Sequence, residues 1–464
     1  MFRTIGDGPS AWELLLPPEV LRLPEELARV GALLDDPVFF APFARYFHPV
    51  LGRPSTPVEC YLRLMFLKFR HRLGYESLCA EVSDSISWRR FCRIPLDGKV
   101  PHPTTLMKLT TRCGEAAVAG LNEALWAKAA GVKLLRTARV RADTTVICAN
   151  VAYPTDSGLL AKAVGKLVRA ARRVQAAGGA TGTVMTDRQR AAARRVRQIA
   201  SKLRARGKLS REETTQAICR VTGELAGLAA LASAEAAAVL RNGRRALPKA
   251  LGGRVRGRLR RALDELAVTL ERTAQIVAQT RSRLAGQTPD SATRLVSLHD
   301  PDARPIRKGR IDRPVEFGYK AQVTDNDDGI ILDYSVEYGA APDHPQLAPA
   351  VQRVHRRTGR MPRAVTADRG YGEPAVERDL HALGVRTVAI PRKAKTSPAR
   401  KAIEHSRRFH RLVKWRTGCE GRISYLKRGY GWDRTRLDSR QGAAIWCGHG
   451  VLAHNLVKIG TLTS

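Results

Sequence analysis

Residues 140–149 read Val-Arg-Ala-Asp-Thr-Thr-Val-Ile-Cys-Ala, a short run in which β-branched side chains are frequent. That composition is typical of a buried strand. A single carboxylate, Asp143, lies within the run. Because the chain carries a net charge of +37, an isolated carboxylate in an apolar strand is expected to hold something positive. The run therefore predicts the first strand of a sheet and a candidate ligand for a cation.

The strand pattern returns only after residue 315. Two runs joined by Asp325-Asn-Asp-Asp-Gly329 predict a β-hairpin. Alternating patterns then predict further strands and helices; the strands are expected at 316–324, 330–338, 364–368 and 385–391, and the helices at 345–357 and 375–383. This order predicts an α/β fold with a mixed sheet and helices on its faces. Asp368 ends one of these strands, where ligands usually sit in such sheets.

Residues 160–288 interrupt the sheet after its first strand and are rich in Ala, Arg and Leu. Apolar residues recur there at helical spacing in four runs, and Ser210 with Glu213 has the form of a capping box. The segment predicts an antiparallel helical or coiled-coil insertion. Its basic outer faces are expected either to lie on DNA or to form a solvated surface.

The first 132 residues predict a separate helical domain. An apolar helix is expected from Pro57, a short helix from Tyr75, and a third helix from Pro103 with Lys108 and Arg112 on its outer face. This arrangement predicts either a DNA-binding domain like a helix-turn-helix or a plain helical packing domain.

Composition limits the compartment and the partner. Lys and Arg number 80 against 43 Asp and Glu, which favours a polyanionic partner over a merely basic enzyme. We expect no membrane span, no signal peptide and a cytoplasmic protein. The eight Cys are scattered and form no Cys-x-x-Cys pair, so reduced thiols are expected. The length of 464 residues suggests two to four domains.

A third acidic residue, Glu420, opens a helical pattern. If Asp143, Asp368 and Glu420 meet, they form an oxygen-only cage for Mg²⁺ or Mn²⁺. Two such ions can activate a water or a 3′-hydroxyl and stabilise the leaving oxygen of a phosphodiester, which predicts the cutting and joining of DNA. Three rival carboxylates have structural explanations: Asp156 and Asp343 are expected to cap helices, and Asp300 is expected to be exposed in a linker.

The stretch from residue 391 to 411 is too basic to be core and predicts phosphate contacts. The DNA-binding candidates in it are Arg392, Lys393, Lys395, Arg407, Arg408 and Arg411. Three aromatic residues follow among further Arg and Lys, and each is expected either to stack on a base or to lie in the core: Trp415, Tyr430 and Trp432.

From about Leu51 to Ile459 the chain resembles the DDE transposases of bacterial insertion sequences. The resemblance rests on the blocks 143–157, 366–371 and 420–427 around the three acidic residues. The fourth family of these elements carries a signature of Tyr, then Arg three residues on, Glu four further and Lys seven further. Arg416, Glu420 and Lys427 keep those spacings, whereas Val413 replaces the Tyr; the related fifth family is less strict at that position.

The resemblance implies a ribonuclease H-like catalytic core with a large helical insertion after its first strand and an all-helical N-terminal domain. The expected parts are an N-terminal helical, DNA-binding domain (1–132), the first part of the core (133–159), the insertion (160–290), and the remainder of the core with a basic C-terminal region (291–464). It also implies Asp143, Asp368 and Glu420 as ligands of two Mg²⁺ or Mn²⁺ ions, and Arg416 and Lys427 as phosphate contacts near the cut.

The implied activity is binding of terminal inverted repeats, cleavage at the element ends and joining of the 3′-hydroxyl to target DNA. A homodimer on paired ends of double-stranded DNA is expected, associated with the nucleoid while bound. Two alternatives stay open: a metal-dependent nuclease or inactive relative with this fold, and a DNA-binding protein without enzymatic activity.

Overall fold

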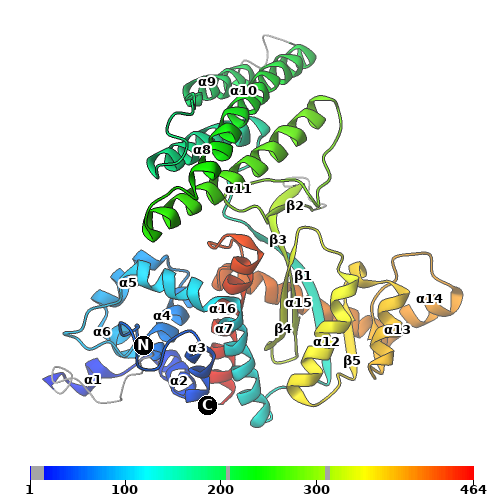
Figure 1. Ribbon diagram of the computed structural model, residues 1–464. Helices are drawn as coiled ribbons and strands as arrows, with labels where there is room; N and C mark the ends of the chain where they lie inside the picture. Colours follow the sequence, from blue (N-terminus) through cyan, green and yellow to red (C-terminus); the bar gives the residue numbers. More distant parts are fainter. Residues whose placement is uncertain (2–14, 205–209, 309–313, 464) are drawn as a thin grey trace. The chain divides into compact units, whose positions relative to one another are not determined.

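The structure, a computed structural model, describes residues 1, 15–204, 210–308 and 314–463. The chain divides into two compact units: residues 1–150 with 318–464, and residues 151–317 (Figure 1). The second unit thus interrupts the first one just after the strand that carries Asp143.

Helices make up the N-terminal part of the first unit. Their bounds are α1 (Pro18–Leu21), α2 (Glu25–Leu34), the 3₁₀ turn η2 (Pro37–Phe39), α3 (Ala41–Ala44), α4 (Val58–Arg70), α5 (Tyr75–Asp84), α6 (Ile86–Phe91) and α7 (Pro103–Gly131). The predicted starts near Pro57, Tyr75 and Pro103 are confirmed. Helix α4 is buried nearly all round, because α2, α5 and the C-terminal helix α16 (Ser439–Leu462) pack against it.

A mixed sheet forms the other part of the first unit, as predicted. Its strands are β1 (Arg139–Cys148), β3 (Val315–Asp325), β4 (Ile331–Tyr338), β5 (Ala364–Ala367) and β6 (Thr387–Ala389), and β2 (Arg304–Arg307) adjoins β3. Strand β3 runs antiparallel to both β1 and β4, while β1, β5 and β6 are parallel. Strand β6 is shorter than the predicted 385–391, because only residues 387–389 pair with β5.

The helices cover the two faces of this sheet, and the alternation of side chains along the strands shows which helix lies on which face. Gln322 contacts the carbonyl of Gln346 in α12 (His344–Thr358). The next residue along β3, Val323, and its partner on β1, Asp143, lie on the opposite face. Helix α15 (Arg407–Gly429) covers that face, and the Sγ atom of Cys419 lies within hydrogen-bond distance of the Val323 carbonyl. The remaining helices of this part are α13 (Pro374–Ala382) and α14 (Pro398–Glu404).

A buried ion pair fixes α15 on the sheet. The Arg141 guanidinium donates two bonds, of 2.7 and 3.0 Å, to the carboxylate of Asp325 on the paired strand. It donates a third, of 2.8 Å, to the Trp415 carbonyl of α15. A Cβ at position 418 would overlap this guanidinium, so Gly418 gives the helix room to approach. The carboxylate of Asp325 also accepts from Arg422, one turn further along α15.

The second unit is a helical bundle. Among its described residues lie α8 (Asp156–Ala176), α9 (Gln189–Arg204), α10 (Arg211–Ala246) and α11 (Gly253–Leu284), and α8, α10 and α11 pack against one another (Figure 1). The capping box of Ser210 and Glu213 is confirmed at the start of α10. Gly243 permits the close approach of α10 and α11, because a Cβ there would lie 2.7 Å from the Leu263 side chain.

One described helix, α10, is long and apolar enough to cross a membrane by length and composition, contrary to the expectation that no segment would be. One face of the helix packs in the bundle, where Leu225, Ala229 and Val239 are buried against its neighbours. The packing of this face accounts for part of the apolar composition, since 33% of the most apolar stretch is buried.

The contact between Gly418 and Arg141 gives a first prediction. Gly418→Ala should lower the free energy of unfolding by about 3 kcal/mol, because the added methyl group displaces Arg141 and leaves the buried Asp325 without its main partner. Gly421→Ala, on the same helix with nothing near its Cβ position, should be neutral or stabilise by about 1 kcal/mol. Urea unfolding measures both variants; equal midpoints would contradict the role of the ion pair.

Candidate active site

Two of the predicted acidic residues meet at neighbouring strands. In the parallel pairing of β1 and β5, Ala142 faces Ala367. The next residue on each strand is Asp143 and Asp368 respectively, so the register brings these carboxylates side by side. Strand β5 ends at Ala367, and the short turn η3 (Arg369–Tyr371) follows. The Asp368 side chain caps this turn by accepting a 2.9 Å hydrogen bond from the Gly370 amide.

The electrostatics show that these carboxylates are crowded. The pKa of Asp143 is raised to about 6, first by burial and then by the negative charge of Asp368, while the Thr144 amide and the Arg416 guanidinium lower it in part. Burial also raises the pKa of Asp368, with the charge of Asp343 as the next cause. The charge of Asp368 raises the pKa of Asp143, and a cation bound between neighbouring carboxylates relieves such repulsion.

Helix α15 supplies the third acidic residue, Glu420, and also Arg416, whose guanidinium lies between Glu420 and Asp143. Arg416 donates to Asp143 Oδ2 at 3.1 Å and to Glu420 Oε1 at 2.7 Å. Glu420 itself is exposed, and it lies one helical turn after Arg416. The guanidinium therefore joins the strand carboxylate to the helix carboxylate.

The donor set suits a hard divalent cation, because it consists of carboxylate oxygens only. Within the described ranges, no three His, Cys, Asp or Glu side chains lie close enough together to hold a metal ion. Arg416 accounts for this spacing, since its guanidinium lies between Asp143 and Glu420. Asp143 and Asp368 are thus the adjacent pair, and Glu420 stands beyond the arginine.

A fourth carboxylate, Asp343, borders the site. It was expected to cap α12, but its side chain makes no capping bond there. Instead Asp343 Oδ1 lies 2.6 Å from Lys320 Nζ of β3. A Cβ at Gly370 would lie 2.8 Å from Asp368 Oδ1 and 3.0 Å from Asp343 Oδ2, so the glycine separates two close carboxylates. The small residue in Asp368-Arg-Gly was the only sequence signal of this crowding.

The other two rival carboxylates also differ from expectation. Thr155, not Asp156, caps α8 through a bond from the Gly158 amide. Asp156 is the first helical residue and pairs with Arg283 at 2.8 Å. The expectation of an exposed Asp300 was wrong: its side chain is buried, because residues 295–298 fold onto the bundle.

Several cations of the basic stretch are paired within the protein. Arg392 forms an ion pair with Glu377 of α13, and Lys393 lies 3.2 Å from Glu373. Arg408 donates to Thr387 Oγ1 at 2.7 Å. The remaining candidates of this stretch, Lys395, Arg407 and Arg411, have exposed side chains. Exposed cations with few internal partners are the better phosphate contacts.

The candidates outside that stretch lie on two helices. Lys427 is half-buried on α15, two turns after Glu420. On α7, Lys108 is exposed, whereas Arg112 donates to the Tyr46 carbonyl and covers the Phe47 ring. Arg112 thus has a structural role that the sequence did not reveal.

Stacking of bases on Tyr430 and Trp432, one of the two alternatives, is wrong. Both rings are buried, and Trp432 donates to the Cys447 carbonyl of α16 at 3.1 Å. Trp415 is half-buried, with the guanidinium groups of Arg139 and Arg141 each 4.6 Å from its ring. Its ring therefore contributes to the contact of α15 with β1.

Comparison with known proteins places the chain in a family. A model described as a transposase domain (DUF772) matches residues 19–112, and a model described as a transposase DDE domain matches residues 293–456. The second range contains Asp368 and Glu420, while Asp143 lies outside both ranges. An uncharacterized protein, ORF8 in the nfe locus of Rhizobium meliloti, is 30% identical over 162 residues, which span 32% of this chain and 74% of that relative. No solved structure matches the chain.

The chain belongs to the DDE-type transposases of insertion sequences. It is accordingly a DDE transposase, a metal-dependent polynucleotidyl transferase that acts on DNA.

The raised pKa of Asp143 gives a second prediction. Between pH about 4 and 6 the folded protein retains a proton that the unfolded chain has lost, so this group makes stability fall as the pH rises through that window. Asp143→Asn should remove that fall, a difference of roughly 3 kcal/mol. Urea unfolding at pH 4, 5, 6 and 7 without divalent cations measures it, with the exposed Asp379→Asn as control. If the free energy of unfolding changed with pH in the same way for wild type and Asp143→Asn, the raised pKa of Asp143 would be contradicted.

Proposed function

We propose that this transposase binds the terminal inverted repeats of its element, cleaves at the element ends and joins the 3′-hydroxyl to target DNA. The observation that carries the proposal is the register of β1 and β5, which brings Asp143 beside Asp368 at the end of β5, together with α15, where Arg416 joins Glu420 to Asp143. A core like that of ribonuclease H is supported by three antiparallel strands, β4, β3 and β1, followed by the parallel β5 and β6.

Asp143, Asp368 and Glu420 would hold the catalytic ions, proposed to be two Mg²⁺ or Mn²⁺. When bound, these ions would activate the attacking water or 3′-hydroxyl and stabilise the leaving oxygen. Asp143 and Asp368 are held by rigid strand and turn backbone, through the amides of Thr144 and Gly370. Glu420 is exposed on a helix, where Arg416 donates to it, so it can change rotamer to join them.

Arg416 would have two roles. Without a metal, it neutralises part of the charge of Asp143 and Glu420. Once a cation takes over those carboxylates, the guanidinium can turn to a DNA phosphate, which it can bind with two hydrogen bonds. Lys427, Lys395, Arg407 and Arg411 are proposed as further phosphate contacts, and Lys108 as a contact of the N-terminal domain.

The division into residues 1–132, 133–159, 160–290 and 291–464 stays a prediction, as does a homodimer on paired ends. Strand transfer distinguishes the proposed transposase from a nuclease with the same site. Joining of a labelled element end to plasmid DNA in the presence of Mg²⁺ tests it, and cleavage without any joined product would favour the nuclease.

A third prediction concerns the acidic residues. Asp143→Ala, Asp368→Ala and Glu420→Ala should each reduce cleavage of end DNA by at least about a hundredfold. The losses should not add in a double variant, because the three residues serve one site. Gel-shift affinity for DNA should be retained or rise, since each variant removes a negative charge.

The matched control for these variants is Asp379→Ala, an exposed carboxylate on α13. It should cleave like wild type. Asp343 is not a suitable control, because it lies beside Asp368. Substantial Mg²⁺-dependent cleavage by Asp368→Ala would show that the proposed site is misplaced.

A fourth prediction concerns Arg416. Without divalent cations, Arg416→Ala should change DNA affinity less than about twofold, because the wild-type side chain is engaged by Asp143 and Glu420. With Ca²⁺ present, the variant should bind about tenfold more weakly than wild type, which is the expected effect of losing one charged hydrogen bond. Arg428→Ala, exposed near the end of α15, serves as control and should respond equally in both conditions. Fluorescence anisotropy measures the affinities. If Arg416→Ala weakened DNA binding equally with and without Ca²⁺, the proposed transfer of Arg416 from the carboxylates to a DNA phosphate would be refuted.

A further inference from the structure

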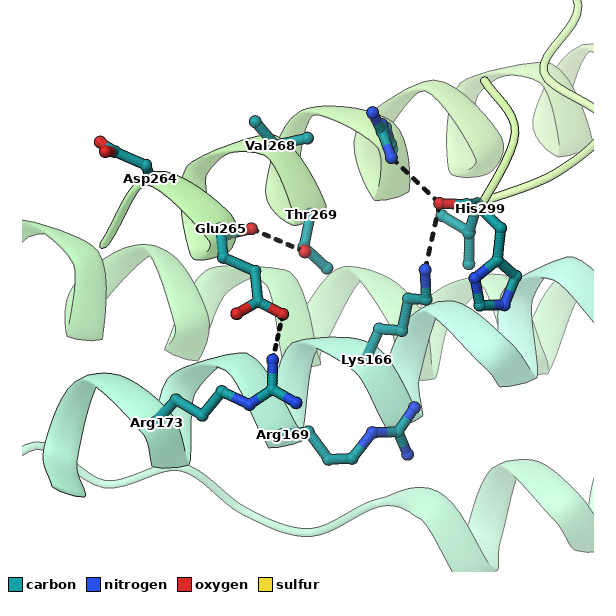
Figure 2. A pocket seen from close by; sticks show the side chains of 10 residues that line it. Lys166, Arg169, Arg173, Asp264, Glu265, Val268, Thr269 and His299 are labelled. Atoms are coloured by element: carbon teal, nitrogen blue, oxygen red, sulfur yellow. Dashed lines mark hydrogen bonds and ion pairs between the residues drawn. The ribbon is translucent and has the colours of Figure 1, made fainter. Parts of the chain in front are cut away.

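A pocket of about 590 Å³ opens on the second unit between α8 and α11. Figure 2 shows Lys166, Arg169 and Arg173 along α8, with Arg173 directed toward Glu265 of α11. Residues 298–299 of the chain after α11 complete the wall. The pocket therefore belongs to the helical bundle and is distinct from the site of Asp143 and Asp368.

The cations of the pocket are held in place from within the bundle. The Leu298 carbonyl accepts from Lys166 Nζ at 3.1 Å and from Arg272 Nη1 at 3.0 Å. A guanidinium has five N–H donors, and this bond uses one of those of Arg272.

The charges are distributed unevenly within the pocket. Arg173 forms an ion pair with Glu265 at one end. Arg169 is exposed, and its bond to Gln189 Oε1 is long, at 3.5 Å. The end of the pocket that Arg169 and Arg272 line is therefore the positive end. Asp264 and Glu265 at the other end would repel an anion, which restricts it to that positive end.

The whole unit carries an excess of positive charge. Residues 151–317 contain 34 of the 80 Lys and Arg but only 14 of the 43 Asp and Glu. This is a net charge of +20 of the total of +37, on little more than a third of the chain. Charge of this density favours a polyanion over a small anionic metabolite, because counterion release adds to each contact.

We propose that this pocket binds a phosphate of the backbone of double-stranded DNA, so that the helical bundle is a second DNA-contacting surface of the transposase. The inference rests on the proposed function, since the DNA that the pocket would bind is the DNA that the transposase would cut and join. Among the lining residues, Val268 is the only exposed apolar side chain, which offers a lipid surface little to hold. Contacts to phosphate also carry no sequence information, so binding here is independent of sequence.

The position of the DNA is tested by photocrosslinking in the full-length protein. A benzophenone amino acid replaces Val268, which lines the pocket and is 42% exposed, or Leu231, which lies on α10 and is 56% exposed. Val268 should crosslink to a labelled DNA duplex, and Leu231 should crosslink at least about fivefold less. Equal yields from both positions, or a crosslink from Leu231 alone, would overturn the proposal.

The charge of the site is tested by the salt dependence of DNA binding. Arg169→Gln combined with Arg272→Gln should reduce the slope of log K against log salt by about one to two and weaken binding by about tenfold or more. The control combines Arg241→Gln with Arg254→Gln, which removes the same charge from exposed positions of α10 and α11 outside the pocket. Identical slopes for the two double variants would overturn the proposal.

The outcomes separate this inference from the proposed function. If wild type cleaves and joins end DNA while Val268 gives no DNA crosslink, the inference fails and the proposed function stands. If Val268 crosslinks to DNA while no cleavage or joining occurs, the pocket binds DNA and the proposed function fails. A Val268 crosslink to vesicles of anionic lipid, with none to DNA, would overturn the assignment of the ligand.

Discussion

The buried ion pair between Arg141 and Asp325 is the constraint on which the proposed catalytic arrangement depends. It joins β1 to β3, and through the Trp415 carbonyl it also joins both strands to α15. Because Asp325 is fully buried, losing its partner would leave an uncompensated charge in the core. The helix that carries Arg416 and Glu420 is thus held beside Asp143 by the same interaction that holds the strands together.

A second consequence of the fold is the balance of charge at the site. Parallel pairing of β1 and β5 forces Asp143 and Asp368 together, and the loop before α12 adds Asp343. The protein compensates with Arg416 on one side and with Lys320 on the other. The site thus has carboxylates with raised pKa values and a cationic side chain on either side, an arrangement in which a proposed divalent cation would replace protons and the arginine.

Local patterns predicted the elements of the fold well, because they depend on short-range chemistry: the β-branched run of β1, the hairpin turn at residues 325–329, and the Ser210 capping box. The environment of Asp343 and Asp300 was not predictable, since it depends on where loops return in space. The burial of Tyr430 and Trp432 was likewise left open, because α16 packs over them from more than ten residues away. Family resemblance indicated the three acidic residues, but only the structure shows that Arg416 lies between two of them.

The central claim is that Asp143, Asp368 and Glu420 surround one divalent-cation site. Iron-mediated cleavage of the backbone tests it most directly, because Fe²⁺ bound in place of Mg²⁺ generates hydroxyl radicals that cut the chain near the metal. After addition of ascorbate and peroxide, we expect the chain to be cut in three separate segments, near residues 143, 368 and 420. Excess Mg²⁺ should suppress all three cuts together. Cuts at only one of these segments, or at sites elsewhere in the chain, would contradict it.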